Sequence, residues 1–384
     1  MKKTIENIFI MCLFFAAGSF ITAQSETGRG FENRFFRLDF EEEQIELDDF
    51  REFFFTTFPH DDPTEGDVVY DRVKWKNSDM VSLRETGLLG YIKYRDDNSS
   101  YDSFRFTSKP YYNLNEKVKQ ILFVFKGKLP SGMGIWPAWW LNGSRQQEWL
   151  YTGEDLINDE MLDKYSGKGR YYETPSPVNC TDWPAAGEVD IIETINGDNL
   201  IHNTIHTCPQ MCDSEWNGNG VIINCANGNE TDPNAGCSGV PYEVDSPEGT
   251  FACYWKDNSF HFYYWEPSED VRFEEGPLSN NPNPEIWNKR NLKNSVRFSD
   301  GDTGCDESIH QEWQCASCEG YNECNFVNLK MIFNITLCGK WAGRNFDGTE
   351  SSLENCKRYI TADGVKYIDD QFFRIEFVSV SAIK

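Results

Sequence analysis

Three acidic side chains interrupt an apolar, β-favouring run in the segment GEVDIIE at residues 187–193. Residues two apart share a face of a regular strand, so Glu188 and Asp190 should point together while Glu193 points to the other face. A β-bulge at Ile191–Ile192 would return Glu193 to the face of the other two acids, because a bulge sets two residues opposite one. We therefore predict that all three acids line one cleft.

Paired carboxyl groups at this spacing suit the cleavage of glycosidic bonds. With the bulge counted as one step, the outer Cα atoms lie roughly 13 Å apart. Two Glu side chains leaning together would bring their carboxyl groups to about 5–6 Å, near the roughly 5–5.5 Å of retaining glycosidases. One carboxylate then attacks while its neighbour keeps a proton for the leaving oxygen. The alternative is a solvated strand face that happens to carry acids.

Tryptophans precede the acids, and aromatic faces can stack on the apolar faces of sugar rings. They are Trp136, Trp139, Trp140 and Trp183. Taken singly, each is more often a core residue than a sugar platform. His206 follows Glu188 by eighteen residues, and from the sequence alone a strand histidine is more often structural. A His202–His206 metal pair lacks an evident third ligand, so we assign no metal.

The elements that must position these residues are mainly strands. Alternation of period two marks half-buried strands in three stretches, and residues 121–125 form a continuously apolar run. Helical periodicity is scarce. Strands joined by Gly-, Asn- and Pro-rich turns predict an all-β sandwich or jelly roll. The alternating residues are Leu329, Met331, Phe333, Ile335 and Leu337; Phe373, Ile375 and Phe377, opposite Arg374 and Glu376; and Phe260, Phe262 and Tyr264.

Two polar stretches break the strand pattern. Residues 144–180 are charged, look inserted and include one possible short helix. Residues 266–325 are rich in Asp, Asn, Pro and Cys, and we expect a disulfide-pinned loop region there. No internal repeat or linker separates two domains, so we expect one catalytic domain over residues 24–384.

The charge of the chain excludes one large class of partner. With 36 basic and 62 acidic residues, the 384-residue chain has a formal net charge of −26. Broad phosphate-driven binding of nucleic acid needs clustered Lys and Arg. An uncharged or cationic partner fits better.

The N-terminus has the pattern of a secretory signal peptide. Lys2 and Lys3 precede an apolar run, and the small residue Ala23 precedes a polar segment. The run is short for a membrane span, which needs roughly 20 residues, so an uncleaved anchor is the minor alternative. We expect residues 1–23 to be removed and the mature protein to be secreted, without a membrane association.

Cleavage would remove Cys12 from the 13 cysteines of the chain. An even number in a secreted protein indicates disulfides, and we interpret the remaining twelve as staples. A zinc site around Cys315, Cys318 and Cys324 is the minor alternative. Five glycosylation sequons fit the same route, although Asn334 is the least expected to carry glycan because its strand could be buried. The sequons begin at Asn98, Asn142, Asn179, Asn229 and Asn334.

Several motifs between residues 58 and 343 together resemble those of a known enzyme family. The sequence resembles glycoside hydrolase family 16, and within it the fungal-type endo-1,3(4)-β-glucanases, or laminarinases. The resemblance covers roughly residues 36–384 in order. The motifs are GIWPAWWLNG (134–143), DWPAAGEVDIIETING (182–197) and NTIHT (203–207), with further matches at 58–70, 103–109, 129–138, 281–287 and 328–343.

The resemblance implies a concave β-jelly roll of two antiparallel sheets that binds a β-glucan across one sheet. It implies that Glu188 is the nucleophile, that Glu193 is the general acid and then the base, and that Asp190 adjusts their protonation. Further residues would bind substrate: His206, Trp140, Trp183, Trp341 and, more weakly, Arg105, for which a surface position is equally plausible. The expected protein is a monomer without a cofactor.

The sequence departs from the family pattern at Ser144–Cys180, which we expect to form a wall or lid beside the cleft. The leading hypothesis is a secreted retaining endo-β-glucanase acting on β-1,3 bonds of laminarin-like or mixed-linkage glucans. The alternatives are a glucan transglycosylase, a non-catalytic glucan-binding recognition protein, and a metal-dependent hydrolase using Asp190, Glu193 and His206. Some family members carry a structural calcium, but the acidic loops here are too numerous to name ligands.

Overall fold

The structure is a computed structural model of the whole chain, in which residues 33–384 form one compact unit. It describes residues 34–56, 60–61, 64–70, 79–95, 100–114, 118–143, 187–207, 213–216, 222–224, 236–298, 326, 328–362, 364–369 and 371–383. The expected signal peptide, the whole insertion at 144–180 and the cysteines of the 266–325 region lie outside these residues. No helix in the described part combines the length and apolar character that a membrane crossing needs.

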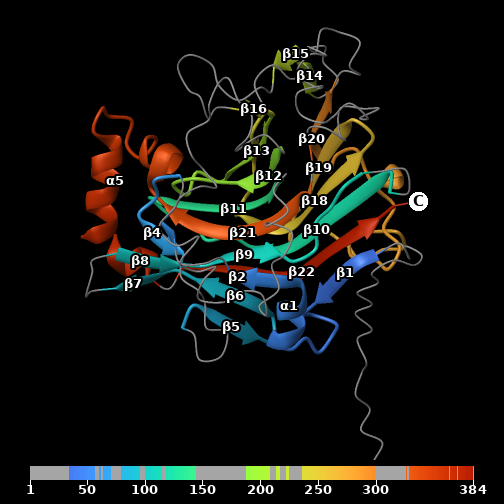
Figure 1. Cartoon of the computed structure of the whole chain (residues 1–384), viewed down its shortest axis with the longest axis horizontal. Helices are drawn as coiled ribbons and strands as arrows, with labels where there is room; N and C mark the ends of the chain where they lie inside the picture. Colours follow the sequence, from blue (N-terminus) through green and yellow to red (C-terminus); the bar gives the residue numbers. More distant parts are fainter. Residues whose placement is uncertain are drawn as a thin grey trace, which may run out of the picture. The chain divides into compact units, whose positions relative to one another are not determined.

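Two large antiparallel sheets dominate the described residues (Figure 1), as the sequence predicts. The larger sheet has the strand order β15-β14-β20-β19-β18-β10-β22-β6-β5, with β1 also paired to β22. Its strands are β1 (Arg34–Asp39), β5 (Val81–Arg84), β6 (Gly87–Tyr91), β10 (Gln120–Lys128), β14 (Asp213–Trp216), β15 (Ile222–Asn224), β18 (Glu248–Lys256), β19 (Ser259–Trp265), β20 (Leu292–Phe298) and β22 (Phe372–Ala382).

The second sheet carries the predicted acids on β12, between β11 and β13. Its order is β16-β13-β12-β11-β21-β9-β2, with β17 also paired to β13. Its strands are β2 (Phe54–Thr56), β9 (Arg105–Ser108), β11 (Ile135–Asn142), β12 (Glu188–Glu193), β13 (Leu200–His206), β16 (Cys237–Ser238), β17 (Tyr242–Glu243) and β21 (Lys330–Leu337).

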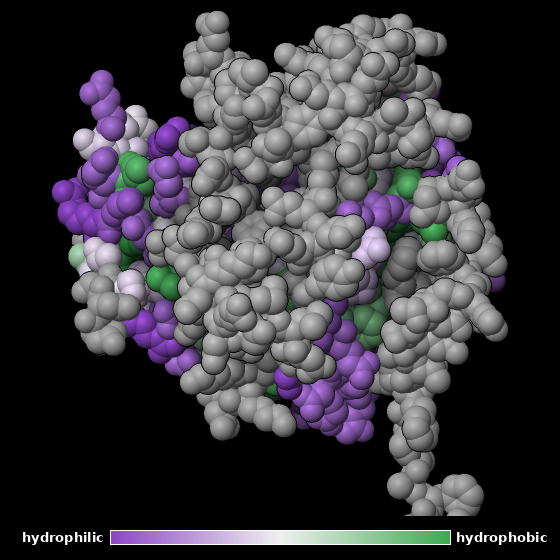
Figure 2. All heavy atoms as spheres, viewed as in Figure 1, coloured by the Kyte–Doolittle hydropathy of each residue, from purple (hydrophilic) through white to green (hydrophobic). Residues whose placement is uncertain are grey.

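Smaller elements complete the described fold. A third sheet pairs β3 (His60–Asp61), β4 (Val68–Tyr70), β8 (Ser100–Ser103) and β7 (Lys93–Arg95). The helices are α1 (Leu47–Phe53), α5 (Ser352–Thr361) and α6 (Val365–Ile368), with a 3-10 turn at Pro284–Ile286 and a π-helical turn at Gly339–Gly343. The surface around α5 is mainly hydrophilic (Figure 2).

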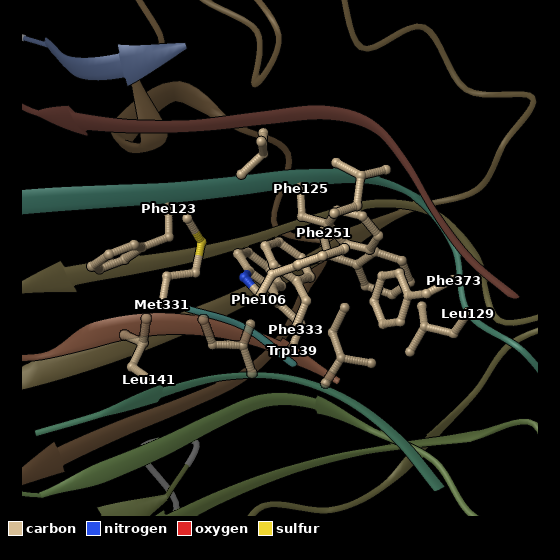
Figure 3. Packing of buried hydrophobic residues seen from close by; sticks show 14 of the residues in the cluster. Phe106, Phe123, Phe125, Leu129, Trp139, Leu141, Phe251, Met331, Phe333 and Phe373 are labelled. Atoms are coloured by element: carbon tan, nitrogen blue, oxygen red, sulfur yellow. The ribbon is translucent and has the colours of Figure 1, made fainter. Parts of the chain in front are cut away.

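The main hydrophobic core lies between the two large sheets. Phe125 of β10 contacts Trp139 of β11 and Phe333 of β21, with ring centroids 5.4 Å apart in both pairs (Figure 3). The predicted inward residues of β19 and β21 all belong to this core. These aromatic contacts join the sheets into a sandwich, and they leave the other face of β12 free for polar side chains.

A second cluster covers the outer face of the larger sheet. Leu122 and Val124 contribute to it, which explains the continuously apolar run: β10 is buried on both faces. Trp287 covers this face, with its ring edge-on to Trp265 at 5.0 Å. The described part of the expected 266–325 loop region therefore packs on the sheet and also contains strand β20.

Two predictions need correction. Phe377 belongs to the outer cluster, whereas Phe373 and Ile375 belong to the main core. The register of β22 against β10 shifts at this point, since Ile375 pairs with Gly127 and Phe377 with Lys126, and the extra residue turns Phe377 to the opposite face.

The second correction concerns the cysteines. Cys253 is free and fully buried among core aromatics, so the prediction that all twelve cysteines are staples is wrong for this residue. Its side chain acts as a small apolar group, and burial raises the pKa of its thiol. A disulfide joins Cys338 to Cys356, and Cys237 is also disulfide-bonded.

Candidate active site

The pairing of β12 with β11 contains the predicted bulge. Trp139 pairs with Ile192 and Trp140 pairs with Asp190, so Ile191 is the additional residue on β12. The pairing with β13 shifts at the same place, since Asp190 pairs with Thr204 and Glu193 with His202. The register shift confirms the bulge at Ile191–Ile192.

The bulge separates the apolar and acidic side chains of β12. Ile191 and Ile192 both pack in the main core and are 2% and 0% exposed. The acids Glu188, Asp190 and Glu193 are absent from this core and are 7%, 3% and 9% exposed. Burying two successive isoleucines brings the following Glu193 to the face of the other two acids.

His206 of β13 joins this acidic cluster. Its Nε2 atom lies 3.2 Å from a carboxylate oxygen of Asp190 and 3.9 Å from one of Glu188. One ligand-type atom from each of these three residues lies within 4.8 Å of the other two. Glu188 is also the register partner of His206, so adjacent strands place both groups directly.

The acids differ from exposed carboxyl groups in their protonation. Burial raises the pKa of Asp190 well above its usual range. Burial and then the charge of Asp190 raise the pKa of Glu193, while the Trp136 hydrogen bond and the His206 charge act in the opposite direction. The net pKa of Glu193 is well above the ordinary value, so this group keeps a proton at a pH where an exposed glutamate is ionised.

Trp136, one of the tryptophans expected as a core residue or a sugar platform, contacts Glu193 directly. Its indole Nε1–H donates a hydrogen bond of 2.8 Å to a Glu193 carboxylate oxygen. Trp341 packs edge-on against Trp136 with centroids 5.5 Å apart, and against His202 at 4.9 Å. Alternation along the strand could have identified Trp136, because Trp136 and Trp140 share one face of β11 and Trp139 lies on the other.

Trp140 and Arg105 form a second polar and aromatic group beside the acids. The Arg105 guanidinium lies 4.9 Å from the centroid of the Trp140 ring. Arg105 is only 3% exposed, so the alternative of a surface arginine is wrong. The Trp140 indole N–H donates to the Asn334 side-chain oxygen at 2.7 Å, and the Asn334 amide nitrogen donates to the Tyr70 hydroxyl at 2.8 Å. Asn334 is therefore committed to buried hydrogen bonds, and its strand β21 is buried, which agrees with the expectation from the sequence that this strand could be buried.

Several predicted features cannot be placed. Trp183, the possible helix of the insertion, the cysteines of the zinc alternative and the sequons at Asn98, Asn179 and Asn229 lie outside the described residues. Asn142 is described, ends β11 and is 8% exposed.

The donors that the structure gathers for a cation differ from those of the metal hypothesis. Within the described chain, Glu188, Asp190 and His206 could supply three ligand atoms. Glu193, which the hypothesis required, is instead hydrogen-bonded to Trp136. Glycosidic cleavage would use Glu188 and Glu193, whereas a cation would be bound by Glu188, Asp190 and His206. The two sets share only Glu188.

Known proteins resemble this chain in sequence and in fold. The family described as "XgeA-like, catalytic GH16 domain" matches residues 178–381. The relatives include a probable glycosidase of Schizosaccharomyces pombe, 23% identical over 78% of this chain and 59% of its own length. An endo-1,3(4)-β-glucanase of Arthroderma benhamiae is 22% identical over 85% of this chain and 61% of its own length. The chain thus spans less than two thirds of these relatives.

Solved structures show the same fold. Laminarinase 16A from Phanerochaete chrysosporium, solved with 6-O-glucosyl-laminaritriose, has a TM-score of 0.56 at 19% identity, covering 91% of this chain and 99% of its own. An elongating family 16 β-1,3-glucosyltransferase has a TM-score of 0.53 at 17% identity, with the same coverage.

Proposed function

This chain belongs to glycoside hydrolase family 16, among its XgeA-like catalytic domains, and we propose that it is a secreted retaining endo-β-glucanase. Its substrates are β-1,3 linkages in laminarin-like or mixed-linkage 1,3(4)-β-glucans. The observation that carries the proposal is the register shift of β12, since it sets Glu193 on the same face as Glu188. The high negative charge of the chain suits an uncharged polysaccharide.

The proposed mechanism is a double displacement. Glu188 attacks the anomeric carbon and forms a glycosyl-enzyme, while Glu193 gives its proton to the departing glycosidic oxygen. Glu193 then takes a proton from water, which releases the sugar with its original configuration. The raised pKa of Glu193 supports its role as the acid.

The neighbouring groups have supporting roles. Asp190 contacts His206 at 3.2 Å and its charge raises the pKa of Glu193, which supports a role for Asp190 in adjusting the protonation of the acid. Four further described residues would contact the sugar: His206, Trp140, Trp341 and Arg105. Trp183, which is not among the described residues, would also contact it.

Substitution of the two glutamates tests the proposal. Glu188→Gln and Glu193→Gln should each reduce the release of reducing ends from laminarin by at least about 10²-fold. Glu376→Gln is the matched control, because Glu376 is also buried at 8% exposure but lies on β22 of the other sheet. Wild-type turnover in either active-site variant would contradict the proposal. Early NMR spectra of the wild-type products should show the β-anomer.

A glucan transglycosylase is the second candidate, and the fold shared with a β-1,3-glucosyltransferase favours it. The same glycosyl-enzyme would then pass to a second sugar in place of water. Products longer than the starting laminari-oligosaccharide would identify this activity. Binding of laminarin without any change in chain length would instead identify a recognition protein, and loss of activity on chelation would favour a metal-dependent hydrolase.

A further inference from the structure

Asn203 of β13 lies directly opposite the bulge of β12. Its neighbours Thr204 and His202 pair with Asp190 and Glu193, so Ile191 and Ile192 together face this single residue. The Asn203 side chain is fully buried, at 0% exposure. It points to the core face, away from the acids, and so it cannot contact a bound sugar.

The Asn203 side chain bonds to the bulge itself. Its Nδ2 atom donates a hydrogen bond of 2.6 Å to the backbone carbonyl of Ile191, the additional residue. A bulge disrupts the regular ladder locally, and a buried carbonyl without a hydrogen bond is costly, by about 1–3 kcal/mol. An aliphatic side chain at position 203 has no N–H group, so it could not donate a hydrogen bond to the Ile191 carbonyl in place of Asn203.

Asn203 is held in turn from the opposite sheet. Its Oδ1 atom accepts a hydrogen bond of 2.7 Å from Asn294 of β20, which is 1% exposed. The same Asn294 nitrogen donates to the Val240 carbonyl at 3.0 Å. These two bonds fix which end of the Asn203 amide faces Ile191, because only the nitrogen can donate to a carbonyl.

We propose that Asn203 is a positioning residue that holds the bulge of β12 and thereby aligns Glu193 with Glu188. The proposal rests on the proposed function, in which these two glutamates act as acid and nucleophile. A one-residue change of register turns every following side chain to the other face of a strand. Loss of the Asn203 bond therefore disturbs Glu193, which follows the bulge, more than Glu188, which precedes it.

This asymmetry gives the proposal a specific kinetic test. In phenyl β-laminaribioside the departing oxygen needs a proton from Glu193, whereas in the 2,4-dinitrophenyl compound the phenolate leaves without one. In both, Glu188 forms the bond to the anomeric carbon as the bond to the aryl oxygen breaks. The value of kcat/KM reports this first step, and its ratio between the two substrates measures proton donation.

Asn203→Leu should lower kcat/KM for the phenyl compound about 10²-fold and for the dinitrophenyl compound less than about 3-fold. Asn291→Leu is the matched control: Asn291 is also buried, at 3% exposure, and donates to the Tyr264 backbone carbonyl at 3.0 Å, far from β12 along the chain. This control should leave the ratio unchanged.

A second variant decides the question if Asn203→Leu fails to fold. Asn294→Leu keeps the Asn203–Ile191 pair but removes its anchor, and it should shift the ratio in the same direction by about 3-fold to 10-fold. Equal losses on both substrates in the folded variants, or an unchanged ratio, would overturn the proposal. If the wild-type protein releases neither phenol, the proposed function fails instead.

Discussion

The chemistry of Glu193 comes from its immediate neighbours. Burial and the nearby Asp190 favour its protonated form, and the Trp136 indole N–H favours the ionised form. Glu193 must be protonated in the first step of a double displacement, where it is the acid, and ionised in the second step, where it is the base. Trp136 is therefore a contact through which the balance can be shifted without changing the carboxyl group.

Trp136→Phe should move the basic limb of the kcat/KM profile to higher pH. The indole bond lowers the pKa of Glu193, so its removal leaves burial and Asp190 to raise that pKa further. We expect the maximum of kcat/KM to fall about 10-fold, since the lost bond to a charged group also oriented the carboxylate. The measurement is kcat/KM on laminarin as a function of pH.

Trp287→Phe provides the control for this experiment. The Trp287 indole N–H also donates a hydrogen bond, to the Glu275 carbonyl at 2.9 Å, but it lies on the outer face of the larger sheet. This variant should keep both limbs of the profile. A basic limb that stays in place in Trp136→Phe, or moves to lower pH, would be incompatible with the predicted effect.

At the scale of elements, irregular segments set the position of the site. The π-helical turn Gly339–Gly343 presents Trp341 to Trp136. The Asn196 side chain, just beyond β12, accepts a bond from the Gly134 N–H at 2.9 Å and donates to the Ala342 carbonyl at 3.0 Å. The Cys338–Cys356 disulfide anchors the start of the same turn to α5.

The double variant Cys338→Ala/Cys356→Ala should unfold more readily and bind long glucans less well. The disulfide closes a loop with a sequence separation of 18, so its loss should lower the free energy of unfolding by about 3 kcal/mol. Because Trp341 follows Cys338 by three residues, we also expect a higher KM for laminarin. Thermal unfolding and initial rates measure the two effects.

Cys253→Ala separates the crosslink from the loss of a buried sulfur. Cys253 is buried and free, so this variant creates a small cavity without releasing any loop. Its KM should equal that of the wild type. A double variant that retains the wild-type KM would show that the disulfide stabilises the turn without placing Trp341.

At the scale of the whole molecule, an ion cluster holds the first strand to the segment on the outer sheet face. Asp39 at the end of β1 is fully buried, and Arg272 contacts it at 2.9 Å. Arg272 also contacts Glu41 at 2.9 Å, and Arg37 contacts Asp39 at 2.5 Å. Burial alone would raise the pKa of Asp39, but the two arginines outweigh it and lower the pKa below its usual range.

Arg272→Met should lower the free energy of unfolding by about 2 kcal/mol at pH 7, because it leaves a buried carboxylate with one partner fewer. A lowered pKa contributes stability above the unfolded pKa and loses it as the pH falls through the folded value. The difference between variant and wild type should therefore shrink at pH values below about 4. Denaturant unfolding at pH 7 and at acidic pH measures it.

Arg290→Met is the exposed counterpart. Arg290 pairs with Glu269 at 2.6 Å, and its side chain is 69% exposed. Its loss should cost less than about 1 kcal/mol. The buried ion cluster would not support the fold if Arg272→Met lowered the free energy of unfolding no more than Arg290→Met, or lowered it equally at both pH values.

The sequence by itself determined the features that depend on local spacing. The acids of β12, the alternation of β19 and β21 and the tryptophans of β11 follow from which side chains share a strand face. The sequence also predicted the bulge, because three acids on one strand face need an extra residue between Asp190 and Glu193. Local spacing does not reveal a bulge without such a functional pattern, which is why Phe377 was assigned to the wrong face.

Only the tertiary structure decided how these elements are held and tuned. Asn203 and Asn294 are 91 residues apart, and Trp136 and Glu193 are 57 apart. Each pair meets because strands from distant parts of the chain become neighbours in the sandwich, and burial between them sets the strength of each hydrogen bond and the pKa of each acid. Spacing along the chain cannot encode a partner that strand pairing within one sheet, as for Trp136 and Glu193, or packing between two sheets, as for Asn203 and Asn294, brings close.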